Sequence, residues 1–131
     1  MTHVLVVEDD ADIRSMLAAR MQSAGFAVSV APDARIALSA VRRRRPDVIV
    51  LDLRLPGMSG LEFCREVRAD GGLAGTGIVV ASASVGEANI AAAYDAGADD
   101  FVTKPFSLAA LLGTVRSVAR DAAARQPLVV G

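Results

Sequence analysis

The stretch from Val48 to Gly60, with the sequence VIVLDLRLPGMSG, constrains the fold of this chain more than any other. Its run of apolar residues ends in one carboxylate, Asp52, and is followed by the turn formers Pro56, Gly57 and Gly60. An apolar run closed by turn formers is typical of a strand buried on both faces of a parallel sheet. Asp52 is therefore predicted at the carboxyl end of that strand, where open α/β sheets form their ligand crevice.

Apolar runs alternate with amphipathic stretches five times along the chain, which predicts an α/β fold. Strands are predicted at 3–7, 27–30, 48–51, 78–84 and 101–103, and the last two helices at 87–96 and 107–124. Gly25 is expected to end the first helix, and Asp33 to cap a second helix with the inner face Ile36, Leu38 and Val41. Strands separated by helices indicate right-handed βαβ units and a parallel sheet covered on both faces.

Composition limits the classes of function. A chain of 131 residues with 53% hydrophobic content and a net charge of -1 fits one domain without a global nucleic-acid or membrane surface. The run from Arg42 to Arg45 is read as a solvated helix end in preference to a nucleic-acid patch. The single cysteine, Cys64, excludes an internal disulfide, and no apolar run is long enough for a membrane span. A cytoplasmic location is expected.

Polar side chains gather at the predicted carboxyl ends of four strands. These residues are Glu8, Asp9, Asp52, Ser82 and Lys104. Two carboxylates 4 Å apart repel by about 4 kcal/mol at an effective dielectric near 20, so a cation is expected among them. An oxygen donor set favours Mg²⁺, because zinc prefers cysteine and histidine ligands.

A carboxylate, an ammonium and Mg²⁺ are the groups that a site for phosphoryl transfer to an aspartate requires. Asp52 is the candidate nucleophile, which would attack in line and form an aspartyl phosphate. Glu8, Asp9 and Asp52 would hold the metal, together with the backbone carbonyl of Arg54. Lys104 would pair with the phosphoryl group.

Simpler interpretations exist for each residue alone. An acidic strand end can be a helix cap, and Ser82 or Lys104 alone would be an ordinary surface residue. The order in which they occur together makes the site the better interpretation. His3, the only histidine, is expected to be an incidental surface residue.

Two other classes of protein remain as alternatives. Asp10 and Asp12 have the DxD spacing of a haloacid-dehalogenase-type phosphatase, although they lie beyond the end of the first strand. A flavin-binding module of the same fold would need a hydroxyl-rich phosphate loop, where this chain has Glu8 and Asp9.

Four motifs are distributed along essentially the whole length of the chain, namely LVVEDD, VIVLDLRLPGMSG, VVASA and AGADDFVTKPFS. Through these motifs the chain resembles the receiver domains of two-component response regulators. The resemblance implies a flavodoxin-like (βα)5 three-layer sandwich with a five-stranded parallel sheet in the order 2-1-3-4-5. Residues 1–124 would form the receiver domain, and 125–131 a C-terminal tail or the start of a linker.

The same resemblance implies the function. Asp52 would accept a phosphoryl group, with Mg²⁺, from a sensor histidine kinase or a histidine phosphotransfer protein. Glu8 and Asp9 match the acidic pair of the family, Lys104 its lysine, and Ser82 its switch hydroxyl. The resemblance also suggests a cis peptide bond between Lys104 and Pro105. The chain would be a signalling switch that catalyses only its own phosphorylation and dephosphorylation.

Phe101 matches the switch aromatic of the family, although alone it would be read as core. The switch surface would comprise the helix at 87–96, the strand at 101–103 and the helix at 107–124, and would control a target or an output domain. In the winged-helix transcription regulators this surface also dimerises, and Asp99, Asp100 and Arg116 are present for its ion pairs. The helix at 87–96 has no Lys or Arg, like the stand-alone chemotaxis-type regulators, so a monomer or a weak activation-dependent homodimer is expected.

Overall fold

Five parallel strands form one sheet in the order β2-β1-β3-β4-β5 in a computed structural model, which describes residues 1–83 and 86–125. The strands are β1 (His3–Val7), β2 (Ala27–Ala31), β3 (Val48–Leu51), β4 (Gly77–Ser82) and β5 (Asp100–Thr103). The helices are α1 (Ala11–Ser23), α2 (Ala34–Arg43), α3 (Gly60–Ala69), α4 (Glu87–Asp95) and α5 (Leu108–Ala124), with a short 3-10 turn η1 (Gly71–Leu73). The predicted flavodoxin-like order is confirmed.

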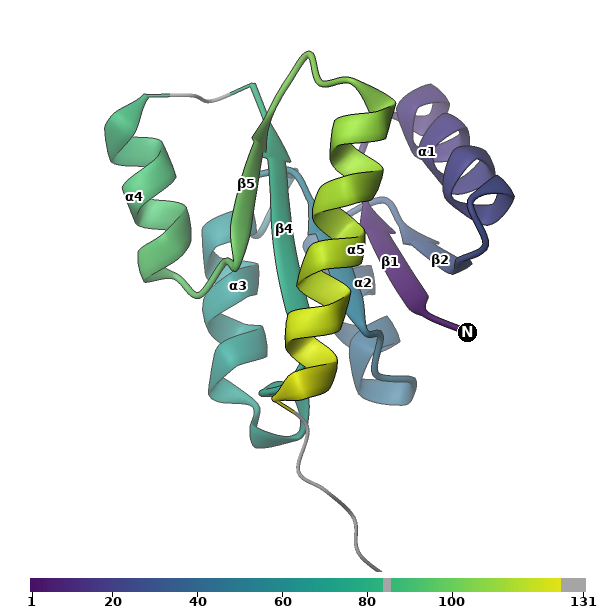
Figure 1. Cartoon of the computed structure of the whole chain (residues 1–131). Coiled ribbons are helices and arrows are strands. Elements are labelled where there is room, and N and C mark those ends of the chain that lie inside the picture. Colours follow the sequence, from purple (N-terminus) through teal and green to yellow (C-terminus); the bar gives the residue numbers. More distant parts are fainter. Residues whose placement is uncertain (84–85, 126–131) are drawn as a thin grey trace, which may run out of the picture.

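The sheet is covered on both faces, as Figure 1 shows with α5 in front and α2 and α3 behind. One cluster of buried residues joins alternate strand positions to α2 and α3, and includes Leu5, Ile49, Ile78, Leu38 and Phe63. The other positions of the same strands pack on α1 and α5, through Val4, Val50, Val79, Leu17 and Leu111. Because successive side chains of a strand point to opposite faces, the continuous apolar runs supply both cores.

Capping residues set the helix boundaries. Asp33 and Ser107 accept hydrogen bonds from Ile36 N and Ala110 N, as the sequence predicted. Gly25 follows α1 with a φ of 99°, which a residue without Cβ adopts without strain. These local signals explain why the observed helix ends differ from the expected ones by only about a residue.

The predicted inner face of α2 is wrong at Ile36, which is 47% exposed. The buried residues of this helix are Ala34, Ala37, Leu38 and Val41. At 3.6 residues per turn these four share one stripe, and Ile36 lies on the opposite side. Two of the inner positions are occupied by small alanines, Ala34 and Ala37.

His3 is not the surface residue that the sequence suggested. It opens β1, which pairs with a strand on each side, and only 6% of the residue is exposed. Its backbone N donates to Asp47 Oδ2 at 2.7 Å, and its Nε2 lies 2.7 Å from Ser29 Oγ. The single histidine is therefore part of the packed end of the sheet.

The loop after β3 folds back so that Gly60 lies against the backbone of Asp52 and Leu53, which is possible because Gly60 has no side chain. Gly60 N donates to Leu53 O at 3.1 Å, and a Cβ on Gly60 would lie 2.5 Å from Asp52 O. Any side chain at this position would push the loop away from the strand end. The turn glycine that was recognised in the sequence thus determines where the Asp52 carboxylate lies.

Candidate functional site

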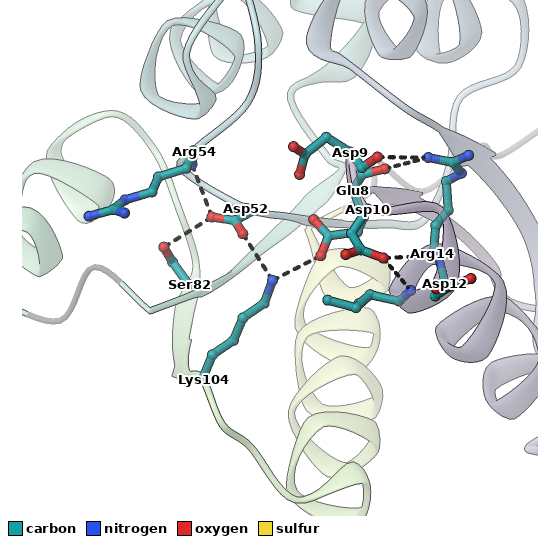
Figure 2. A network of polar contacts seen from close by, with 10 residues as sticks. Glu8, Asp9, Asp10, Asp12, Arg14, Asp52, Arg54, Ser82 and Lys104 are labelled. Carbon is teal, nitrogen blue, oxygen red and sulfur yellow. Dashed lines mark hydrogen bonds and ion pairs between the residues drawn. The ribbon is translucent and has the colours of Figure 1, made fainter.

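Asp52 directly follows β3, and its carboxylate is surrounded by donors from its own loop and from two other segments, the ends of β4 and β5 (Figure 2). Oδ1 accepts hydrogen bonds from Arg54 N at 2.9 Å and from the Ser82 hydroxyl at 3.1 Å. Oδ2 accepts from Lys104 Nζ at 2.9 Å. The side chain is 14% exposed, so the carboxylate is oriented by the protein and still reached by solvent.

Lys104 links the carboxylate of Asp52 to that of Glu8. Its ammonium lies 2.9 Å from Asp52 Oδ2 and 3.0 Å from Glu8 Oε1, as Figure 2 shows. The Lys104 backbone N donates to Ser82 O at 3.0 Å, which fixes the start of the segment that carries the side chain. Lys104 is also the only lysine of the sequence, whereas every other basic side chain apart from His3 is an arginine. A compact ammonium contacts two carboxylates that converge on one point more readily than a planar guanidinium does.

The Glu8 carboxyl is the most buried charged group of the site, with only 4% of its side chain exposed. Burial raises its pKa above the ordinary value of 4.5, and the hydrogen bond and charge of Lys104 only partly oppose this effect. At Lys104 the balance is reversed: burial acts to lower the pKa, but the hydrogen bonds and charges of Asp52 and Glu8 outweigh it and the pKa is raised. Lys104 is therefore charged at neutral pH and stabilises an otherwise unfavourable pair of carboxylates.

The raised pKa of Glu8 predicts how stability depends on pH. The folded state holds a proton on Glu8 that the unfolded state has released, so the free energy of unfolding should fall as pH rises from 4.5 through the folded pKa. Glu8→Gln removes this titration, and its pH profile should be flatter than that of the wild type. Urea unfolding at pH 4.5 to 7 measures both, with the wild-type profile as the reference. Parallel profiles for wild type and Glu8→Gln would contradict the assignment.

The acidic side chains of the site are oxygen donors of the kind that bind a divalent cation. Glu8 Oε2 is buried and has no hydrogen-bond partner, which is costly unless a further cation or donor satisfies it. Glu8, Asp9 and Asp52 offer only carboxylate oxygens, the ligands that suit Mg²⁺. Within residues 1–83 and 86–125, no three His, Cys, Asp or Glu side chains are grouped closely enough to form a metal cage. The carboxylate oxygens and the unpartnered Glu8 Oε2 are the features of this site that suit Mg²⁺.

The structure brings four of the sequence-predicted residues into one hydrogen-bonded group, namely Glu8, Asp52, Ser82 and Lys104. Asp9 lies beside the group and is exposed. Phe101 is half-buried and packs against the cluster between the sheet, α2 and α3. The Lys104-Pro105 peptide is cis, as the resemblance suggested.

Asp10 has a different role from the one that a phosphatase would require. Its Oδ1 accepts hydrogen bonds from Asp12 N at 2.9 Å and Ile13 N at 3.0 Å, so it is the N-cap of α1. The candidate DxD motif is therefore a helix start, and its first carboxylate is occupied by backbone donors.

Arg14 was not recognised in the sequence as part of the site. Its Nη1 donates to the carbonyl oxygens of Glu8 at 2.9 Å and Asp9 at 3.4 Å, which fixes the backbone that carries both acids. Nothing in the spacing distinguishes Arg14 from a solvated arginine in the first turn of a helix. Only the tertiary path of the loop between β1 and α1 reveals the contact.

The residues expected at a dimer interface are largely engaged within the chain. Asp99 Oδ2 accepts from Arg68 Nη2 at 2.9 Å and Ile78 N at 2.8 Å, and its Oδ1 pairs with Arg125 at 3.0 Å. The Arg116 guanidinium lies 5.7 Å from the centroid of the Phe26 ring, a cation–π arrangement. Asp99 and Arg116 thus have internal partners, which the sequence did not reveal.

None of the helices within the described residues combines the length and apolar character needed to cross a membrane. The four-arginine run lies at the end of α2, as predicted, where Arg42 is 3.9 Å from both Glu66 and Asp70.

Comparisons with known proteins agree with this geometry. The family model described as "Response regulator receiver domain" matches residues 4–116. The DNA-binding response regulator MtrA of Mycobacterium tuberculosis is 41% identical over 114 residues, covering 87% of this chain and 49% of that protein. The transcriptional regulatory protein CseB of Streptomyces avermitilis is 40% identical over 119 residues, covering 91% of this chain and 49% of that protein. The chain thus spans about half the length of these curated relatives.

Solved structures give the same result. The chemotaxis response regulator CheY4 of Vibrio cholerae matches with a TM-score of 0.86 and 34% identity, over 90% of this chain and 98% of that one. The BeF3-activated N-terminal receiver domain of RstA from Klebsiella pneumoniae matches with a TM-score of 0.83 and 29% identity, over 91% of this chain and 99% of that one. Receiver domains of this kind are signalling switches. The chain belongs to the family of two-component response regulator receiver domains.

Proposed function

We propose that this receiver domain accepts a phosphoryl group on Asp52 from a phosphohistidine donor, with Mg²⁺, and transmits the change to a partner or an output domain. The observation that carries the proposal is the Asp52 carboxylate, which is held by Lys104, Ser82 and the Arg54 backbone N. These groups orient a nucleophile and supply positive charge where a transferred phosphoryl group would lie.

In the proposed reaction a carboxylate oxygen of Asp52 forms a bond to phosphorus while the bond from phosphorus to the donor imidazole nitrogen breaks. Lys104 balances the negative charge on the phosphoryl oxygens, and Ser82 donates a hydrogen bond to one of them. Glu8, Asp9, Asp52 and the Arg54 carbonyl would hold Mg²⁺, which in receiver domains neutralises charge on the transferring oxygens. Attack of water on the phosphorus later releases inorganic phosphate and restores the Asp52 carboxylate.

Acetyl phosphate tests this proposal without the natural donor. Incubation with acetyl phosphate and Mg²⁺ is expected to produce one acid-labile phosphate per chain, which peptide mapping after borohydride trapping should locate at Asp52. Removal of the metal with EDTA should reduce incorporation to background, because charge on the phosphoryl oxygens is then balanced by Lys104 alone. Incorporation that is unaffected by EDTA, or located elsewhere, would refute the proposed chemistry.

We further propose that the phosphoryl donor docks beside Lys104. An open groove of about 460 Å³ lies there, lined by Ile13 and Met16 of α1, Ala83, and Pro105 and Phe106 before α5. Met16 is 44% exposed and shares this groove with Ile13, Pro105 and Phe106, so the groove presents an apolar surface suited to contact with a partner. A helical domain of a histidine kinase or phosphotransfer protein could cover this groove and bring its imidazole to Asp52.

Signal output is proposed to depend on Ser82 and Phe101. Ser82 is completely buried at the end of β4, so a change in its hydrogen bond to Asp52 must be accommodated by neighbouring side chains. Phe101 lies on the adjacent strand, half-buried, and can respond by changing its packing. The α4, β5 and α5 surface then differs between the two states, which is a population shift.

Ser82→Ala should separate phosphorylation from output. The nucleophile, Lys104 and the metal ligands remain, so the variant should still take up phosphate at Asp52. Amide chemical-shift changes around Phe101 on addition of beryllofluoride should fall to about half or less of the wild-type changes, because the hydrogen bond that couples them is lost. Two-dimensional NMR measures this, with Ser82→Thr as the control that keeps the hydroxyl. Wild-type shift changes in Ser82→Ala would show that another group couples the site to Phe101.

We also propose domain bounds, an oligomeric state and a cellular location for this chain. Residues 1–124 form the receiver unit, and the predicted tail at 125–131 lies, beyond Arg125, outside the described residues. Internal pairing of Asp99 with Arg68 and Arg125 supports a monomer before phosphorylation and at most a weak homodimer after it. The domain would act in the cytoplasm, without contacting nucleic acid itself, and pass its signal to a target or an output domain.

A further inference from the structure

A second pocket lies at the opposite end of the sheet from Asp52. It has a volume of about 310 Å³ and is bordered by the start of β1, by β2 and by the end of α2, close to the N-terminus marked in Figure 1. We call it the His3 pocket, because His3 lies in its wall. β1 separates His3 from Glu8 by five residues, or roughly 16 Å of extended chain, so the two sites are distinct.

Two arginines at the mouth of this pocket lack a carboxylate partner. Arg43 and Arg44 line it, and within the described part of the chain neither forms an ion pair within 4.0 Å. Arg42, in the same run, does lie near Glu66 and Asp70, and Arg45 lines a different hollow beside Asp70. The four arginines therefore do not act as one basic helix end. Arg43 and Arg44, whose charges are not paired with a carboxylate among the described residues, line the His3 pocket.

The wall of the pocket contains a buried polar group with unused hydrogen-bonding capacity. His3 is 6% exposed, and its Nδ1 has no hydrogen-bond partner. Burial and the charge of Arg44 lower the pKa of His3, against the opposing charge of Asp47, so the ring is neutral at neutral pH. The His3 Nδ1 atom has less than 1 Å² of exposed surface, so a ligand in the pocket cannot contact it. When Nε2 donates to Ser29 Oγ, the Ser29 hydroxyl proton is left free, and Ser29 lines the pocket and is partly exposed. This tautomer therefore leaves the Ser29 hydroxyl as a donor for a bound acceptor.

We propose that the His3 pocket binds a small organic anion, whose phosphate or carboxylate group lies between Arg43, Arg44 and the Ser29 hydroxyl. Guanidinium groups bind such oxyanions through paired, charge-assisted hydrogen bonds. The apolar part of the ligand would contact Val30, which is 46% exposed, and Pro46. The volume is at the lower end of that of small-molecule sites, and the divided arginine run does not offer the continuous basic surface that a nucleic acid requires.

The single histidine provides a direct assay for this proposal. Phenyl phosphate is titrated into the full chain at pH 7.5 and constant ionic strength, and the imidazole signals of His3 are followed by NMR. They should shift with saturation, and inorganic phosphate should bind more weakly because it lacks the apolar part. Benzoate, in a parallel titration, distinguishes a carboxylate site from a phosphate site.

Two arginine variants separate a specific site from general attraction of anions. Arg44→Ala should weaken binding of phenyl phosphate by about tenfold, the effect of losing one charge-assisted contact. Arg45→Ala removes the same charge one residue away and should leave the affinity within about twofold, since Arg45 faces another hollow. Equal losses in the two variants, a shift that never saturates, or no shift of the His3 signals would each overturn the proposal. An ion bound near Asp52 would leave the His3 signals unchanged and would also count against it.

Discussion

Asp52→Asn should abolish phosphorylation by acetyl phosphate, with a loss of at least about 10³-fold, because the substitution removes the nucleophile itself. The carboxamide has nearly the same shape as the carboxylate, and its single oxygen can still accept hydrogen bonds from Arg54 N and Ser82, whereas its NH2 group replaces the oxygen that accepts from Lys104. The variant should therefore fold normally, which circular dichroism can check. Incorporation of radiolabelled phosphate, resolved by peptide mapping, is the measurement.

A neighbouring aspartate supplies the matched control for this variant. Asp33 also follows a strand, β2, and its carboxylate caps α2 through Ile36 N at 2.8 Å. Asparagine is an equally good N-cap, so Asp33→Asn should retain both its fold and its phosphorylation. If Asp52→Asn still accepted phosphate at the wild-type rate, or if Asp33→Asn lost it equally, Asp52 would not be the acceptor.

Lys104→Met is expected to produce the second largest effect, on both chemistry and stability. Loss of a preorganised positive group beside the transferring oxygens should slow phosphorylation by roughly 10² to 10³-fold. The same change leaves the Glu8 and Asp52 carboxylates without their shared ammonium, so the free energy of unfolding at pH 7 should fall by about 2 kcal/mol. This is less than for a fully buried pair, because the Lys104 side chain is 20% exposed. Phosphate incorporation and urea unfolding measure the two effects.

Two further variants separate these effects. Lys104→Met combined with Glu8→Gln removes the buried charge, so stability should recover while phosphorylation stays slow. Lys104→Arg keeps the charge, but its larger planar guanidinium places its N–H groups differently from the compact lysine ammonium between Glu8 Oε1 and Asp52 Oδ2, so the rate should recover only partly. Full activity of Lys104→Met, or recovery of phosphorylation in the double variant, would exclude a direct role of the ammonium.

The sequence alone determined the sheet and the strand ends. Apolar runs and turn formers are local signals, and the connection rules for βαβ units leave few arrangements of five such strands. Once the strands are parallel, their carboxyl ends meet at one edge, so the convergence of Glu8, Asp52, Ser82 and Lys104 followed from chain order. The spacing could not reveal the hydrogen bonds, such as the single ammonium that contacts both Glu8 and Asp52.

Only the tertiary structure decided which faces are covered and which charges are paired. His3 was read as exposed, because a histidine at a strand start carries no signal of the two neighbouring strands that bury it. Arg68 and Asp99 form an ion pair although 31 residues separate them, and Arg14 binds the carbonyls of the acidic loop by a contact that no periodicity encodes. Such contacts depend on how distant segments pack, whereas the periodicity of a sequence reports only the local backbone and the side that each residue faces.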